Sequence, residues 1–187
     1  VIQFRDSGLT IGSNADGDLD IVSDGTAVDS INVESAGGIT LDAGTAGSGI
    51  IYEDDGTEMM RIHNSSSDVI IESKVSDKDI IIKGNDGGST VSALTLDMSA
   101  AGAATFNSSV TAGGDVTAFS DMRIKHDIET IEGALAKVSD MRGVYFKRNN
   151  GEAGTGVIAQ EVENILPEVV KDGEYKSVAY GNMVGIL

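Results

Sequence analysis

The first 119 residues are a succession of short apolar runs separated by turn residues, and this pattern most limits the folds open to the chain. The runs are three to five residues long, several alternate apolar with polar residues, and pairs such as Asp55-Gly56 and Gly113-Gly114 lie between them. Period-two alternation is typical of β-strands, and such turn pairs connect hairpins. We therefore predict strands at residues 1–5, 9–11, 19–22, 31–33, 39–41, 50–52, 59–63, 69–72, 79–83 and 94–97.

Strands this short bury little apolar surface, and the aromatic residues available before Phe119 are Phe4, Tyr52 and Phe106. A single chain built in this way would have only a marginal core. Three chains around one axis would allow the apolar face of each strand to meet its own copies. We therefore expect a mainly β fibrous stalk, an elongated and intertwined homotrimer.

The distribution of charge marks a change near Phe119. The whole chain has a formal net charge of −17. Residues 1–119 contain 5 Lys and Arg against 19 Asp and Glu, whereas residues 120–187 contain 8 against 11. We place the domain boundary there, with domains at 1–119 and 120–187. So acidic a chain is repelled by nucleic acid and anionic lipid, and no apolar run approaches the roughly 20 residues that span a bilayer, so we expect neither nucleic-acid binding nor membrane insertion.

The residue types that hold metals and cofactors are scarce. The chain has no cysteine, and its two histidines are His63 and His126. The segment that begins at Asp16 resembles the start of a calcium loop, but Ile21 stands where that loop needs glycine. Asp54 and Asp55 are adjacent carboxylates, yet a hairpin tip explains them better than a paired-carboxylate site. We therefore expect no metal site and no cofactor.

From residue 128 onward the pattern becomes mixed. Ile128, Ile131, Leu135, Val138 and Met141 would fall on one face of a helix. The segments that follow predict a small α/β domain. They are strands at 144–148 and 156–158 around a turn at 149–151, a helix at 159–166 ended by Pro167, a hairpin of 168–171 with 175–180, and the start of a helix at 183–187.

Four strings in the second domain occur in an order that resembles a known family. They are FSDMRIKHDI, ALAKVSDMRGVYFKR, GTGVIAQEVENILPEVV and KSVAYGNMVGIL. Residues 119–187 are similar through them to the endosialidase-type intramolecular chaperone, a family of auto-processing peptidases that closes phage tail fibres and tailspikes. The family's module continues into a long helix after the equivalent of Ile186-Leu187, so we expect this chain to be truncated there. Because it starts at Val1 and not at Met, we also expect a fragment or processed product.

The resemblance implies a function and a location. The family's module drives trimerisation of the fibre and then cuts itself off. The chain would be the distal part of a tail fibre or tailspike, made in the bacterial host cytoplasm and carried in the virion. Its partners would be its own copies and other phage tail components.

The resemblance also implies a catalytic site. The family cuts just before the serine of an SD-x-R-x-K motif, which is represented here by Ser120, Asp121, Arg123 and Lys125. The scissile bond would be Phe119–Ser120, with Ser120 as nucleophile and Lys125 as general base. Arg123 would support the site, either as a cation near the lysine or by steadying the oxyanion, and Asp121 is a further supporting candidate.

The chemistry is reasonable in itself. A neutral lysine amine can activate a serine hydroxyl, and burial or a neighbouring cation favours the neutral form of a lysine. Residues five apart point to different faces of a helix, so the motif must lie on a turn or strand for Ser120 to meet Lys125. The attack would form an ester that water hydrolyses, without an outside substrate. We expect cleavage to wait for trimer assembly, because earlier release would leave strand edges open.

Two other functions fit parts of the sequence. The first is a receptor-binding adhesin that contacts host surface glycan, in which the C-terminal domain is a purely structural trimerisation cap. Few aromatic residues are available for stacking on sugars in residues 1–119, which argues against it. The second is a polysaccharide-degrading spike, for which no carboxylate pair stands out.

Overall fold

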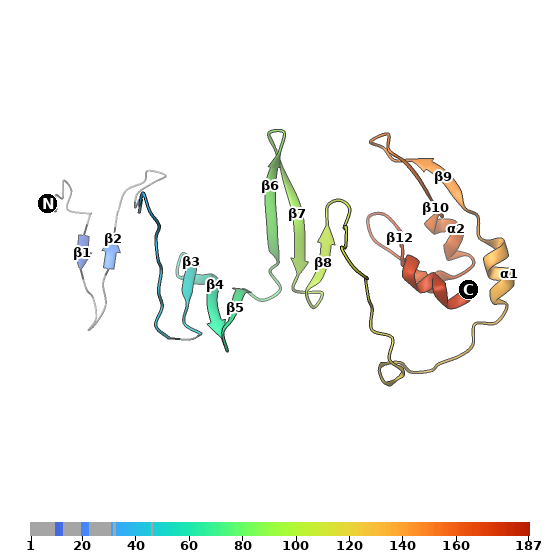
Figure 1. Ribbon diagram of the computed structural model, residues 1–187, viewed down its shortest axis with the longest axis horizontal. Coiled ribbons are helices and arrows are strands. Elements are labelled where there is room, and N and C mark those ends of the chain that lie inside the picture. Colours follow the sequence, from blue (N-terminus) through green and yellow to red (C-terminus); the bar gives the residue numbers. More distant parts are fainter. Residues whose placement is uncertain (1–9, 13–19, 23–30, 32, 46) are drawn as a thin grey trace. The chain divides into compact units, whose positions relative to one another are not determined.

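The computed structural model describes residues 10–12, 20–22, 31, 33–45 and 47–187. It divides into two compact units, with the division between Gly113 and Gly114. The predicted strand at 1–5 lies outside the described residues, and those at 9–11 and 19–22 lie partly outside them. Phe119 and Ser120, the predicted scissile pair, both belong to the second unit. Figure 1 shows the elements in chain order.

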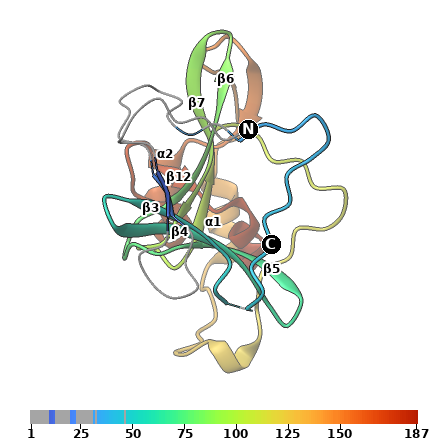
Figure 2. The ribbon, with the colours of Figure 1, turned by 90° about the vertical axis from the view of Figure 1, so that its left-hand side faces the viewer.

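The first unit consists of small antiparallel sheets, as the alternating pattern predicts. β1 (Thr10–Gly12) pairs with β2 (Asp20–Val22). Two three-stranded sheets follow, in which each strand pairs with the next along the chain. In both Figure 1 and Figure 2, β6 and β7 run side by side as a long hairpin. The strands of these sheets are β3 (Ile50–Asp54), β4 (Thr57–Ser65) and β5 (Asp68–Ser73), then β6 (Ile80–Asp86), β7 (Ser89–Asp97) and β8 (Ala103–Phe106).

Some predicted strands are wrong. Residues 39–41 form no strand, and residues 31 and 33 lie in a bend and in coil. Their apolar side chains are exposed, with Leu41 at 67% and Val33 at 68%. Alternation of apolar and polar residues is therefore not sufficient to form a strand here. A strand also needs a neighbouring strand with which its backbone N–H and C=O groups form hydrogen bonds. β8 was missed because its sequence, AATF, begins with two alanines, which are weakly depleted in strands, and shows no apolar–polar alternation.

The hairpin tip between β3 and β4 is confirmed. Asp55 and Gly56 have φ values of 48° and 73°, both in the left-handed region. Two-residue hairpin loops of this kind need positive φ at both positions, which glycine and aspartate tolerate best. Asp54 ends one strand and Thr57 begins the next, so the adjacent carboxylates of Asp54 and Asp55 belong to a turn.

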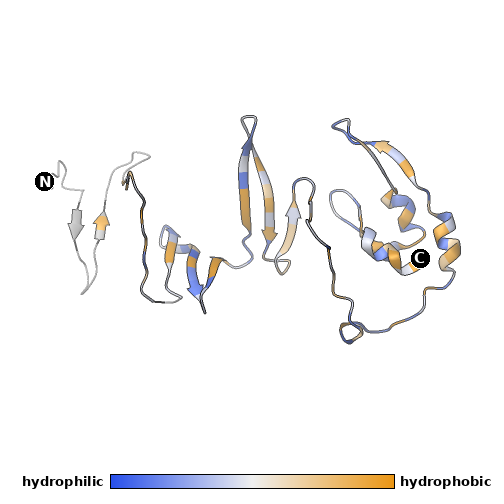
Figure 3. Cartoon of the chain, in the orientation of Figure 1, coloured by the Kyte–Doolittle hydropathy of each residue, from blue (hydrophilic) through white to orange (hydrophobic). Residues whose placement is uncertain are grey.

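Each three-stranded sheet carries a row of apolar residues paired across its strands. Ile50, Ile62 and Ile71 are in register across the first sheet. Ile82, Leu94 and Phe106 are in register across the second. Paired residues share a face, so each row is a continuous apolar strip. The chain itself leaves these strips largely open, with Ile71 58% exposed, and Figure 3 shows apolar residues on the strands of both sheets.

The second unit is a small mixed domain. A left-handed Gly133 with φ 65° precedes helix α1, so Ile128 and Ile131 lie outside the helix that was predicted to include them. The returning strand β10 lies earlier than the predicted 156–158, because the turn closes with a bond from Arg148 N to Glu152 O at 2.8 Å. Helix α2 is also shorter than the predicted 159–166. The elements are η1 (Met122–Ile124), α1 (Ala134–Asp140), β9 (Val144–Lys147), β10 (Ala153–Gly156), α2 (Ala159–Glu163), η2 (Pro167–Val169), β11 (Val170–Lys171), β12 (Ser177–Val178) and η3 (Tyr180–Ile186).

The buried core of the described residues lies in this unit. Val162, Leu166, Val169 and Ile186 are each at most 5% exposed and form one cluster. Val162 lies on α2 and Ile186 ends η3, so this cluster ties the last segment of the chain to the middle of the domain. Among the described residues, no helix combines the length and the apolar character that crossing a membrane requires.

Polar contacts reinforce that arrangement. Lys137 Nζ on α1 donates to Ile165 O at 3.0 Å. Lys176 Nζ contacts Glu163 at 2.8 Å and Asp172 at 2.5 Å, which joins the β11–β12 hairpin to α2. The domain is therefore held together by contacts between segments that are far apart in the sequence.

Candidate active site

The predicted catalytic motif is built around a single 3-10 turn, η1, with Ser120 and Asp121 before the turn and Lys125 after it. Asp121 is its N-cap, and the Asp121 Oδ1 atom accepts a hydrogen bond from Arg123 N at 2.8 Å. Lys125 follows the turn in extended conformation, and its backbone N donates to Met122 O at 3.1 Å. A side-chain oxygen that accepts from the second residue of a turn is the usual way in which aspartate starts such a turn. The motif is therefore not part of a longer helix.

This turn brings Ser120 and Lys125 together. Lys125 Nζ donates to Ser120 Oγ at 2.7 Å, although five positions separate the residues. A nucleophile and its base must lie within hydrogen-bond reach, and this distance meets that condition. Both residues are exposed in the single chain.

Asp121 and Arg123 form a pair of their own. Arg123 Nε donates to Asp121 Oδ1 at 3.0 Å, and Arg123 Nη2 donates to Asp121 Oδ2 at 2.7 Å. These bonds lower the pKa of the Asp121 carboxyl and raise the pKa of the Arg123 guanidinium. The contacts of Arg123 in the described structure are thus with Asp121, and its roles toward the lysine or an oxyanion stay predictions. Asp121 acts on the turn itself, as its cap and as the counterion of Arg123.

A hollow of about 680 Å³ adjoins the Ser120–Lys125 pair. One side is formed by Val116, Ala118, Phe119, Ser120 and Lys125. The side chain of Phe119 is 97% exposed. The other side is formed by η3, through residues that include Asn182 and Val184. Sequence reasoning missed η3 as part of the site. The one available signal was that the string KSVAYGNMVGIL belongs to the same module as the SD-x-R-x-K motif.

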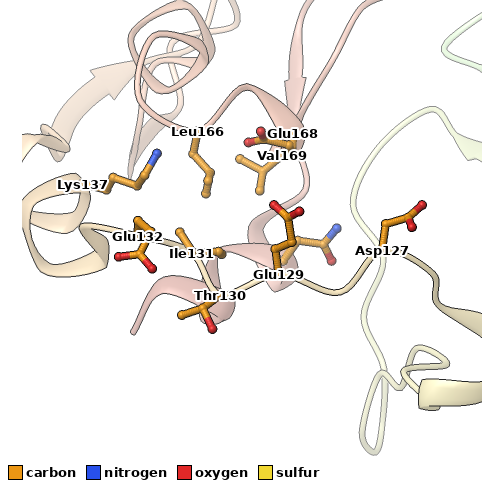
Figure 4. Close-up of a pocket in the computed structure, with 10 residues that line it drawn as sticks. Asp127, Glu129, Thr130, Ile131, Glu132, Lys137, Leu166, Glu168 and Val169 are labelled. Carbon is orange, nitrogen blue, oxygen red and sulfur yellow. The ribbon is translucent and has the colours of Figure 1, made fainter.

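A second hollow of about 640 Å³ is rich in carboxylates. Figure 4 shows Leu166 and Val169 on one side, facing the segment that carries Glu129 and Ile131. Glu168, Asp127 and Glu132 also line this hollow. Over the part of the chain that the structure describes, no three or more His, Asp and Glu residues are grouped so as to hold a metal ion. Acidic residues around an open hollow do not by themselves define a ligand, and we assign it no function.

Comparison with known proteins identifies the class of this domain. Residues 120–171 match the family described as chaperone of endosialidase. The match begins at Ser120, the first residue of the motif, and includes the turn η1 and the core residues of α2 and η2. Residues 120–171 are therefore similar to the chaperone domains of that family, and the resemblance found in the sequence is confirmed.

The relatives are fibre proteins of bacteriophages. The chain is 35% identical over 85 residues to the long tail fiber protein Gp37 of Escherichia phage AR1, which covers 38% of this chain and 8% of the relative. It is 38% identical over 61 residues to the proteins of the same name from Enterobacteria phages K3 and T2, which covers 29% of this chain and 5% and 4% of those relatives. The chain thus spans less than a tenth of the length of these relatives, which are components of the virion.

Proposed function

We propose that the chain is the distal part of a phage tail fibre or tailspike whose C-terminal domain assists trimerisation and folding and then cleaves itself off at Phe119–Ser120. The observation that carries this proposal is the 2.7 Å bond between Lys125 Nζ and Ser120 Oγ, at the start of the segment that matches the chaperone family. A lone serine–lysine contact would be ordinary on a protein surface. This contact supports the proposal because it joins the serine and the lysine of the SD-x-R-x-K motif, at the start of the matched segment.

The proposed reaction uses groups of this chain and one water molecule. Neutral Lys125 takes the hydroxyl proton of Ser120 while the Oγ atom attacks the carbonyl carbon of Phe119. The resulting lysine ammonium gives the proton to the Ser120 nitrogen as the carbon–nitrogen bond breaks. Phe119 is then joined to Ser120 by an ester, and Ser120 has a free amino group. Water hydrolyses the ester, which releases a carboxylate at Phe119 and restores the hydroxyl.

The apolar strips of the first unit support the trimeric stalk. Ile71 and Ile82, one from each strip, are more than half exposed. Exposed apolar strips of this extent are unfavourable in water and mark interaction surfaces. Copies of the same strip around a three-fold axis would cover them, so the partners we propose are two further copies of this chain, with other phage tail components beyond them. Contact with host glycan remains a separate hypothesis, tested by a glycan array on residues 1–119.

Mass spectrometry of freshly expressed protein tests the cleavage. The expected products end at Phe119 and begin at Ser120. Ser120→Ala and Lys125→Ala should leave the chain intact and folded. Lys125→Arg should also block the cut, since a guanidinium stays protonated and cannot act as a base.

Two results would contradict this function. A cut at another bond would overturn the site, and normal processing of Lys125→Arg would show that the lysine is not the base. If no variant and no unmodified protein is cut, the C-terminal domain is a structural cap of an adhesin fibre, which is the alternative reading.

A further inference from the structure

The hollow beside Ser120 and Lys125 contains one further polar side chain among its described lining residues. That side chain belongs to Asn182. The rest of the lining is apolar or glycine, namely Val116, Ala118, Phe119, Gly181, Val184 and Gly185. Asn182 lines both this hollow and the carboxylate-rich one. In the hollow beside Ser120 it is the one lining residue, apart from Ser120 and Lys125, whose side chain can donate a hydrogen bond.

The proposed reaction needs a donor at this place. When Ser120 Oγ attacks the Phe119 carbonyl, negative charge develops on the Phe119 oxygen. A neutral amide N–H that faces this oxygen in apolar surroundings stabilises it more than water does. Arg123, the donor suggested by the sequence, is instead bound to Asp121 through two nitrogens, Nε and Nη2. We propose that the Asn182 side-chain amide donates a hydrogen bond to the Phe119 oxyanion, an inference that rests on the proposed self-cleavage.

The position of Asn182 depends on the tertiary fold. Its backbone N donates to Ala179 O at 2.9 Å in the first turn of η3. The same 3-10 segment ends at Ile186, which is 5% exposed in the core with Val162 and Leu166. The donor thus reaches the hollow only after η3 has packed onto the domain. Ser120 and Lys125 can meet through their own short turn, but the site is complete only when the end of the domain has folded.

The test is the single-turnover rate of self-cleavage in the full chain, followed by mass spectrometry or gel after dilution from denaturant. Asn182→Ala should slow the cut on the order of 100-fold, the loss typical of one oxyanion donor. Asn182→Leu has a similar size, removes the amide donor, brings no charge next to Lys125 and should be slow as well. Asn149→Ala is the matched control, because Asn149 lies in the β9–β10 turn and does not line the hollow. It should be cut at the normal rate.

Two further measurements separate a catalytic role from a structural one. Circular dichroism and light scattering establish that each variant is folded and assembled like the unmodified chain. If Asn182→Ala is not, the rate of the uncharged variant Asn182→Leu decides. The rate of the folded variant should fall by the same factor at every pH, since an amide does not titrate. A shifted pH profile would mean that the substitution moved Lys125, and it would overturn the donor role.

The outcomes also distinguish this inference from the function on which it rests. Cleavage of a folded Asn182 variant within about threefold of the normal rate would overturn the inference alone, provided that Ser120→Ala stays intact. Cleavage of Ser120→Ala, or no cleavage of the unmodified chain, would remove the proposed function and the inference with it.

Discussion

At the scale of single residues, Asp121 caps the turn that lies between Ser120 and Lys125. It also binds the guanidinium of Arg123. The side-chain hydrogen bond from Arg123 is the main reason why the pKa of the Asp121 carboxyl is lowered. The ion pair between these two residues is therefore complete above the ordinary pKa of aspartate, and it is lost only as the pH falls through the lowered value. The turn therefore stays capped at neutral pH.

Substitution of Asp121 tests this positioning role. Asp121→Ala removes the cap and should slow self-cleavage several-fold without unfolding the domain, because Ser120 and Lys125 would be apart for more of the time. Asp121→Asn keeps an oxygen that can accept from Arg123 N and should recover most of the rate. Cleavage rates of the two variants, measured side by side, check this. Equal rates for Asp121→Ala and unmodified protein would show that the turn needs no cap.

At the scale of elements, η3 contributes residues both to the buried core and to the lining of the hollow. Ile186 is its one buried residue, and Leu187 beside it is 91% exposed. Ile186→Ala should destabilise the second unit by about 2–5 kcal/mol, as large-to-small core substitutions do, and should slow cleavage because η3 no longer holds Asn182 at the hollow. Thermal unfolding and the cleavage rate measure the two effects.

Leu187→Ala is the control for that experiment. It removes a similar volume from an exposed position, so both stability and cleavage should stay close to normal. Loss of stability in Ile186→Ala with an unchanged cleavage rate would separate η3 from the active site and would count against the role of Asn182.

At the scale of the whole molecule, the apolar strips of the stalk define the expected contact between chains. Ile71→Asp places a carboxylate in the middle of one strip, where burial against other copies would leave it without a partner. If the first unit forms the proposed trimer, a fragment of residues 1–113 with this substitution should elute as a monomer or aggregate. Size-exclusion chromatography with light scattering reports this directly.

Ser66→Asp serves as the matched charge change. Ser66 has φ 50° in the turn between β4 and β5, a conformation that aspartate tolerates, and it lies outside the strip. That variant should remain trimeric. A trimer of normal thermal stability in Ile71→Asp would show that the strip is not the contact between chains.

The sequence by itself determined what depends on neighbours along the chain. Asp55-Gly56 marks a two-residue hairpin because only few residues accept its left-handed backbone, and the alternation around it identifies the strands on either side. Four strings in order, of which the SD-x-R-x-K motif belongs to the first, gave the resemblance to the chaperone family, which the comparison with known proteins then confirmed over residues 120–171. The close contact of Ser120 with Lys125 is also local, since one short turn produces it.

The tertiary structure decided what depends on contacts between distant segments. It placed the start of α1 after Gly133, although the apolar periodicity begins before that residue, because a helix is interrupted where the backbone turns left-handed. It also decided that residues 39–41 form no strand. A strand needs a second strand to pair with, and the alternation of apolar and polar residues does not say whether one lies beside it. The tertiary structure also brought Asn182 to the hollow that Ser120 lines, because Ile186 packs into a core whose other members lie on α2, η2 and the segment between them. No pattern along the chain contains that contact, since burial of apolar side chains joins residues by their position in space and not by their separation in sequence.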